Sequence, residues 1–134
     1  MTAKFYHIQL NVSNAERSIL FYRALLRKLG WRRVIDRGKD YIGIGGRNVN
    51  FWIIETERRF RRRRYHRKQT GLNHLAFRVP SRQAVDRFVK EFLKPRGIKT
   101  LYGTPKEFPE YRKGYYAVFF EDPDRIKLEI VYIP

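Results

Sequence analysis

The chain contains an internal repeat, and this repeat limits its possible folds more than any other feature. Residues 5–12 read Phe-Tyr-His-Ile-Gln-Leu-Asn-Val, and residues 71–79 read Gly-Leu-Asn-His-Leu-Ala-Phe-Arg-Val. Both segments place a histidine among alternating apolar residues, and both are followed within two residues by a serine and a helical pattern. One offset of 67 residues relates His7 to His74, Val12 to Val79, Phe21 to Phe88 and Gly30 to Gly97. Four matches at one spacing indicate a duplicated unit rather than chance.

The first copy predicts a strand, a helix and three further strands. Residues 5–12 alternate between an apolar face and a polar face that carries His7, Gln9 and Asn11. Residues 13–16, Ser-Asn-Ala-Glu, match a capping box, and helical spacing continues to Leu29, where Gly30 is a suitable stop. Strands are expected at 31–35, 39–44 and 49–55.

The second copy follows the same order. A strand is expected at 72–79, then a helix that Ser81 caps and that ends at Pro95-Arg96-Gly97. Strands are expected at 98–102, 115–120 and 126–133, with a Gly/Pro-rich loop over 103–114 and a tight turn at 122–125.

These patterns predict an α+β fold built from two tandem βαβββ modules in one domain of residues 1–134. Module 1 covers about 4–57, a basic linker covers 58–70, and module 2 covers 71–134. A helix on one face of a sheet leaves the other face without a partner. Two such sheets can pair and curve into an eight-stranded mixed sheet shaped like a cup, with the helices outside.

The composition limits the function in several ways. The net charge is +17, and residues 58–68 hold eight Lys or Arg among eleven residues; without these eight the charge is still +9. We interpret the segment as a solvated linker, because runs of like charge repel and rarely pack. The remaining positive charge favours an anionic ligand. The absence of cysteine excludes disulfides and thiolate ligands. No signal sequence and no bilayer-length apolar run are found, so we expect no membrane association and a cytoplasmic location.

Three residues form a candidate metal site. His7 and His74 hold equivalent places in the two copies, and Glu129 lies in an otherwise apolar final strand. A carboxylate there is costly unless it is paired or binds a metal. Two imidazoles and a carboxylate suit Fe(II), Mn(II) or another divalent first-row ion. From the residues alone, a structural role for each histidine and an ion pair between Glu129 and an Arg or Lys remain open.

The sequence resembles the vicinal oxygen chelate superfamily, which includes glyoxalase I, bleomycin resistance proteins, extradiol dioxygenases and fosfomycin-modifying thiol transferases. The resemblance covers essentially the whole chain. It is carried by residues 7–13, by 18–31, by 71–79 and above all by 120–129, where Asp-Pro-Asp precedes a strand that carries a glutamate. Arg125 departs from the family pattern, which usually has Gly there.

The resemblance implies that His7, His74 and Glu129 bind one divalent ion, whether Fe, Mn, Ni or Zn. It implies a lyase, ring-cleaving dioxygenase or thiol-transferase reaction on a small substrate that chelates the metal through neighbouring oxygens. Four-ligand members take a ligand from the fourth strand, where Trp52 is expected opposite Glu129. This argues against glyoxalase I activity.

Further site residues are expected around this centre. If Glu121 pairs with Ile126, Tyr116 shares the face of Glu129 and can act as an acid or a hydrogen-bond donor. Gln9, Asn11, Trp52 and Arg78 are expected to line the cup and bind substrate, and the chain is expected to form a homodimer.

Two other functions need consideration. The chain could be a metal-free protein that sequesters a drug-like or natural-product ligand between aromatic walls, as in bleomycin resistance; the aromatic residues available are Trp31, Trp52, Tyr102, Tyr111, Tyr115 and Tyr116. The intact His/His/Glu set counts against this. Nucleic-acid binding through residues 58–68 is not favoured, because no recognition fold accompanies the charge.

Overall fold

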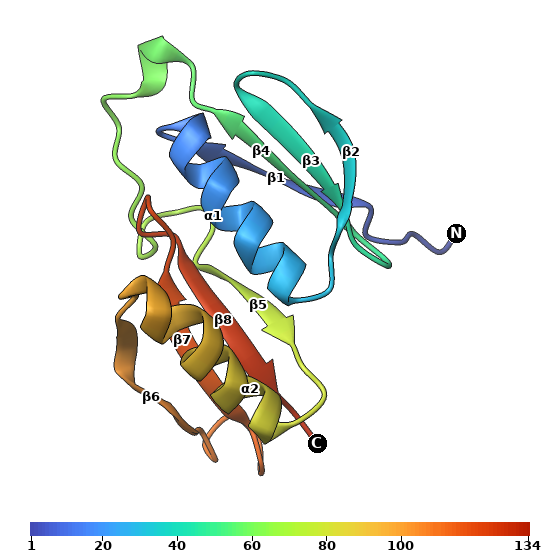
Figure 1. The fold of residues 1–134 in the computed structure, drawn as a ribbon, viewed down its shortest axis with the longest axis vertical. Coiled ribbons are helices and arrows are strands. Elements are labelled where there is room, and N and C mark those ends of the chain that lie inside the picture. The colour runs from blue at the N-terminus through green and yellow to red at the C-terminus, as the bar shows by residue number, and fades with distance from the viewer. The chain divides into compact units, whose positions relative to one another are not determined.

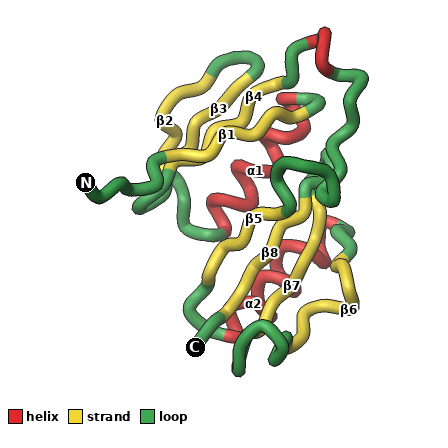
Figure 2. Tube along the Cα trace, turned by 180° about the vertical axis from the view of Figure 1, so that it is seen from behind, coloured by secondary structure: helices red, strands yellow, loops and turns green.

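A computed structural model describes all residues, 1–134. The chain divides into two units, residues 1–64 and 65–134, and the division falls within the basic segment. Each unit is a four-stranded mixed sheet with one main helix on one face (Figure 1). Viewed from behind, the strands of each unit lie in front of its helix, so the second face carries no helix (Figure 2). The α+β class and the two tandem modules are therefore confirmed.

The N-terminal unit contains β1 (His7–Val12), α1 (Ala15–Lys28), β2 (Arg33–Arg37), β3 (Tyr41–Gly45) and β4 (Asn50–Glu55). Its strand order is β1-β4-β3-β2, with β1 parallel to β4 and the other pairs antiparallel. A short 3-10 helix, η1 (Arg58–Phe60), follows.

Helix α1 begins and ends where short-range chemistry favours it. Asn14 is the N-cap, and its Oδ1 accepts a hydrogen bond from the Arg17 amide at 2.8 Å. The expected capping box, with Ser13 first, is therefore displaced by one residue. Glu55 at the end of β4 accepts the Ala15 amide at 2.8 Å and so holds the helix start against the sheet. At the other end, Gly30 has a φ of +89°, which residues with a Cβ rarely adopt.

The core of this unit lies between α1 and the sheet. Tyr22, Leu25 and Leu26 of α1 are fully buried against strands that contribute Ile42 and Ile53. This apolar contact holds the helix on one face and leaves His7, Gln9 and Asn11 of β1 exposed on the other.

The C-terminal unit contains β5 (His74–Arg78), α2 (Arg82–Phe88), a π-helical turn η2 (Val89–Leu93), a 3-10 turn η3 (Lys94–Arg96), β6 (Thr100–Glu107), β7 (Tyr116–Glu121) and β8 (Lys127–Tyr132). Its strand order, β5-β8-β7-β6, repeats that of the first unit, with β5 parallel to β8. Ser81 caps α2 by accepting the Ala84 amide at 3.1 Å. The duplication indicated by the 67-residue offset is thus present in the sheet topology.

Strand β6 is longer than predicted. Glycine and proline after Tyr102 indicated a loop, yet the strand continues to Glu107 through an irregular stretch in its pairing with β7. Tyr102 and Gly103 both have positive φ there. Thr104 bridges the irregularity, because its hydroxyl donates to the Leu101 carbonyl at 2.7 Å and accepts the Phe119 amide at 3.0 Å. A bulge with its own hydrogen bonds has taken the place of the loop.

The turn between β7 and β8 sets the register of the candidate site. Asp122 accepts the amides of Asp124 and Ile126, each at 2.8 Å. Arg125 has a φ of +65°, which explains why glycine suits this position. Glu121 pairs with Lys127 and Phe119 with Glu129. The predicted pairing of Glu121 with Ile126 was therefore wrong by one residue, because the turn consumes one more residue than the alternation suggested.

Part of the basic segment is held by local contacts. Arg61 pairs with Glu55, Arg67 pairs with Glu121 at 2.6 Å, and the Tyr65 hydroxyl donates to the Leu72 carbonyl at 2.6 Å. No helix is long and apolar enough to cross a bilayer.

Candidate functional site

Glu129 is the most unusual side chain in the C-terminal unit, because it is a carboxylate with only 1% of its surface exposed. It lies in the middle of β8, on the sheet face opposite α2, beside Ala76 of β5 and Phe119 of β7. A buried carboxylate requires a compensating partner.

His74 supplies one partner. Its Nε2 lies 3.0 Å from Glu129 Oε2, and its side chain is 34% exposed. Its Nδ1 lies 2.7 Å from Asn73 Oδ1, an oxygen that can only accept. Nδ1 thus faces the Asn73 side chain, and Nε2 is the nitrogen that faces the carboxylate. Metal-binding histidines typically have their other ring nitrogen hydrogen-bonded to a side chain or carbonyl, as Asn73 contacts Nδ1 here.

Tyr115 supplies the other partner. Its hydroxyl donates a hydrogen bond to Glu129 Oε1. Burial, followed by the hydrogen bond and the negative charge of Glu129, raises the pKa of Tyr115 well above its usual value. The phenol therefore stays protonated at neutral pH and orients the carboxylate. The sequence named Tyr115 only as an aromatic wall, and the correct register would have revealed its role, since Tyr115, Ala117 and Phe119 alternate onto the face of Glu129.

Tyr116 was expected in this position and lies elsewhere. Its hydroxyl donates to Asp86 of α2 at 2.7 Å, and the guanidinium of Arg82 lies 4.5 Å from its ring centroid. Burial and the bond to Asp86 raise the pKa of Tyr116. The one-residue difference in register turns Tyr116 toward the helix, so the reason for choosing it no longer holds.

A hollow of about 370 Å³ opens beside His74 and Glu129. Its walls are mainly aromatic, and the lining residues are His74, Tyr102, Phe108, Tyr111, Tyr115, Phe119, Lys127 and Glu129. Its size is within the range of small-molecule sites. Arg78, predicted to bind substrate, is not among them; it is exposed, and its guanidinium donates to the Ile133 carbonyl at 2.7 Å.

The N-terminal unit has a corresponding hollow of about 360 Å³ on its helix-free face. It is lined by Tyr6, His7, Gln9, Arg33, Ile35, Asn50 and Trp52. His7 pairs with Asn50 as His74 pairs with Lys127, so Trp52 occupies the register position of Glu129. This agrees with the expectation from sequence. Asn11 is exposed on the same strand but does not line the hollow.

The three predicted ligands are divided between the units. His74 and Glu129 meet within the C-terminal unit, and His7 belongs to the N-terminal unit. Neither unit alone brings together three His, Asp or Glu side chains that could hold a metal. An imidazole and a carboxylate are nevertheless donors that first-row divalent ions accept. The chemistry of the His74–Glu129 pair therefore fits part of a metal site.

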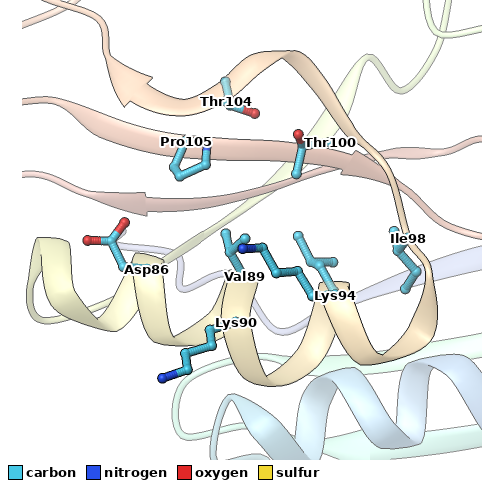
Figure 3. Close-up of a pocket in the computed structure, with 9 residues that line it drawn as sticks. Asp86, Val89, Lys90, Lys94, Ile98, Thr100, Thr104 and Pro105 are labelled. Atoms are coloured by element: carbon cyan, nitrogen blue, oxygen red, sulfur yellow. The ribbon is translucent and has the colours of Figure 1, made fainter.

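A third hollow, of about 430 Å³, lies on the helix side of the C-terminal sheet. Figure 3 shows it between the α2–η2 segment and β6, with Asp86 at one end and Ile98 at the other. Its only carboxylate, Asp86, already accepts the Tyr116 hydroxyl. It contains no histidine, and so it is a weaker candidate for catalysis.

Comparison with known proteins identifies relatives over nearly the full chain. Residues 4–130 match the model of the Glyoxalase/Bleomycin resistance protein/Dioxygenase superfamily. The uncharacterized protein YqjT of Bacillus subtilis (strain 168) is 38% identical over 128 residues, covering 94% of this chain and 96% of YqjT. The crystal structure of a candidate glyoxalase from Bacillus halodurans is 39% identical with a TM-score of 0.87, covering 96% of this chain and 95% of that one. A glyoxalase/bleomycin resistance protein from Albidiferax ferrireducens T118 is 22% identical, with a TM-score of 0.72 and coverage of 97% and 98%, and so supports the fold alone.

Proposed function

Because the chain belongs to the glyoxalase/bleomycin resistance protein/dioxygenase superfamily, we propose that it is a divalent-metal-dependent enzyme. Its substrate is a small molecule with two neighbouring oxygen atoms, and its metal ligands are His7, His74 and Glu129. The observation that carries the proposal is the buried carboxylate of Glu129, oriented by His74 and Tyr115. When bound, the cation would supply Lewis-acid stabilisation of negative charge on the substrate oxygens.

The residues around Glu129 support this function by fixing its geometry. The Asn73 side chain contacts Nδ1 of His74, so that Nε2 is directed toward the carboxylate. The Tyr115 phenol holds the other carboxylate oxygen and can donate no proton to bulk water at neutral pH, because its pKa is raised. The carboxylate of Glu129 is shielded from water, with 1% of its surface exposed.

A three-ligand centre is favoured over a four-ligand centre. In the N-terminal unit, Trp52 occupies the position that corresponds to Glu129 of the C-terminal unit, and an indole ring cannot bind a metal. Glu55 cannot substitute for it, because Glu55 accepts the first amide of α1 and pairs with Arg61. The reaction is then of the lyase, ring-cleaving dioxygenase or thiol-transferase type rather than that of a four-ligand glyoxalase.

Metal content tests the proposal directly. Protein purified without chelator is analysed by mass spectrometry for Fe, Mn, Ni and Zn, and then titrated with each ion after stripping. His7→Ala, His74→Ala and Glu129→Gln should each reduce metal content to a small fraction of wild type. His66→Ala is the matched control, because His66 is the remaining histidine and is exposed in the basic segment. Undiminished metal in His7→Ala, with loss in the other two variants, would contradict the shared three-ligand site.

The aromatic hollow favours one alternative function, which is metal-free sequestration of a drug-like or natural-product ligand between aromatic walls, as in bleomycin resistance. Five aromatic side chains line it. In that case stripped and metal-loaded protein would bind the ligand equally, and no substrate would turn over.

A further inference from the structure

The hollow beside Glu129 is built from interlocking aromatic rings. Phe108 and Tyr111 stack in parallel at 5.3 Å, and Tyr111 meets Tyr115 edge to face at 5.5 Å. Phe119 joins them through an edge-to-face contact with Phe108 at 5.6 Å, and it also contacts Tyr102 at 5.7 Å. Rings held by one another present fixed flat surfaces, which are well suited to a planar ligand.

Lys127 is the one cationic side chain that lines the hollow. Its ammonium lies 5.6 Å from the Tyr102 ring centroid and 5.5 Å from that of Phe119. It forms no ion pair. Its neighbour across the sheet, Glu121, is bound by Arg67 at 2.6 Å and lies 3.5 Å from Arg125. The structure thus holds an unpaired positive charge against aromatic walls.

We infer that this hollow receives a small planar aromatic carboxylate, with its ring against the aromatic walls and its carboxylate paired with Lys127. This inference rests on the proposed function in placing the substrate beside Glu129. A cavity of about 150 Å³ is enough to bind benzene, so 370 Å³ admits a substituted ring. Charge and shape together select against neutral rings and against non-planar acids.

Binding of three probes to metal-stripped protein tests the inference. Benzoate carries both features, benzamide lacks the charge, and cyclohexanecarboxylate lacks the planar ring. Calorimetry or ligand-observed NMR should give an affinity for benzoate about tenfold higher than for either of the other probes, which is the usual effect of one partly buried charged contact. Equal affinity for all three would overturn the inference.

Three variants connect the selectivity to named residues. Lys127→Met keeps the aliphatic stem and should weaken benzoate about tenfold while leaving benzamide within about twofold. Tyr111→Ala, at an exposed wall residue, should weaken benzoate and benzamide alike. Lys113→Met is the matched control outside the hollow and should change neither affinity. Unchanged benzoate binding in folded Lys127→Met protein, with folding checked by circular dichroism, would also overturn the inference.

The experiments can refute the ligand class and the metal-dependent enzyme proposal independently of each other. Because the probes are tested without metal, benzoate selectivity that depends on Lys127 supports the ligand class even if no cation binds to His7, His74 and Glu129. Metal binding by those three residues without benzoate selectivity overturns the ligand class and leaves the enzyme proposal standing.

Discussion

Among single residues, Glu129 was predictable from sequence and Tyr115 was not. A carboxylate in an apolar strand is conspicuous whatever its neighbours, because burial of an unpaired charge is unfavourable. The partner on the next strand depends on the exact register, and the Asp122 turn shifted that register by one residue. In a strand, such a shift moves each side chain to the opposite face. The alternation correctly found the strand, and the error concerned only which of two adjacent tyrosines contacts the carboxylate.

Replacing the Tyr115 hydroxyl should therefore have a measurable effect. Tyr115→Phe leaves the buried carboxylate with one donor fewer, so we expect a loss of about 1–2 kcal/mol in the free energy of unfolding, measured with urea. If the proposed metal site is correct, the affinity for the cation should also fall by about tenfold, because a group that orients a ligand is lost.

Tyr111→Phe is the control for this change. Tyr111 is 63% exposed and contacts the same hollow through its ring. Removing its hydroxyl should alter stability by less than about 0.5 kcal/mol. Equal losses in both variants would show that the bond from Tyr115 to Glu129 has no special role.

The strands and helices were predictable to the extent that their signals are local. Both modules were predicted with their elements in the right order. The prediction used the internal repeat, the apolar alternation of the strands and the glycines that follow the helices. The strand predicted at 98–102 ended too early, because the bulge that lets β6 continue depends on a hydrogen bond between Thr104 and the Phe119 amide, 15 residues away. Non-local hydrogen bonds of this kind leave no short-range pattern in the sequence.

The pair formed by Gly43 of β3 and Trp52 of β4 offers a test within one sheet. The residues are directly opposite, and a Cβ on Gly43 would lie 2.6–2.8 Å from three atoms of the indole ring. Gly43→Ala should therefore displace Trp52, destabilise the fold by about 1–3 kcal/mol and change the tryptophan fluorescence.

A double-mutant cycle identifies the cause of this effect. In a Trp52→Leu background the clash is relieved, so the same Gly43→Ala change should lose at least half of its destabilising effect. If the two changes are additive, the glycine is required for some reason other than contact with the indole.

At the scale of the whole molecule, the net charge follows directly from the sequence, and the fold pairs only some of the positive side chains with carboxylates. The chain has a net charge of +17, so like charges repel one another in the compact state. Within the basic segment Arg59, Arg61 and Arg67 have carboxylate partners. Arg62, Arg63 and Arg64 have none and are exposed.

Salt should therefore stabilise this protein. The screening length falls from about 30 Å at 0.01 M salt to about 8 Å at 0.15 M, which weakens repulsion between distant charges more than contact between adjacent ones. We expect the melting temperature to rise by about 3–5 °C between these concentrations, equivalent to about 1 kcal/mol. Replacing the unpaired Arg62, Arg63 and Arg64 by serine should raise the melting temperature at 0.01 M salt and reduce its response to added salt.

The paired arginines of the same segment provide the matched control. Replacing Arg59, Arg61 and Arg67 by serine removes the same charge but also removes ion pairs to Glu57, Glu55 and Glu121. Their loss should lower the melting temperature or leave it unchanged at 0.01 M salt. If both triple variants are stabilised equally, net charge alone governs stability, and the ion pairs that fasten the segment contribute nothing measurable.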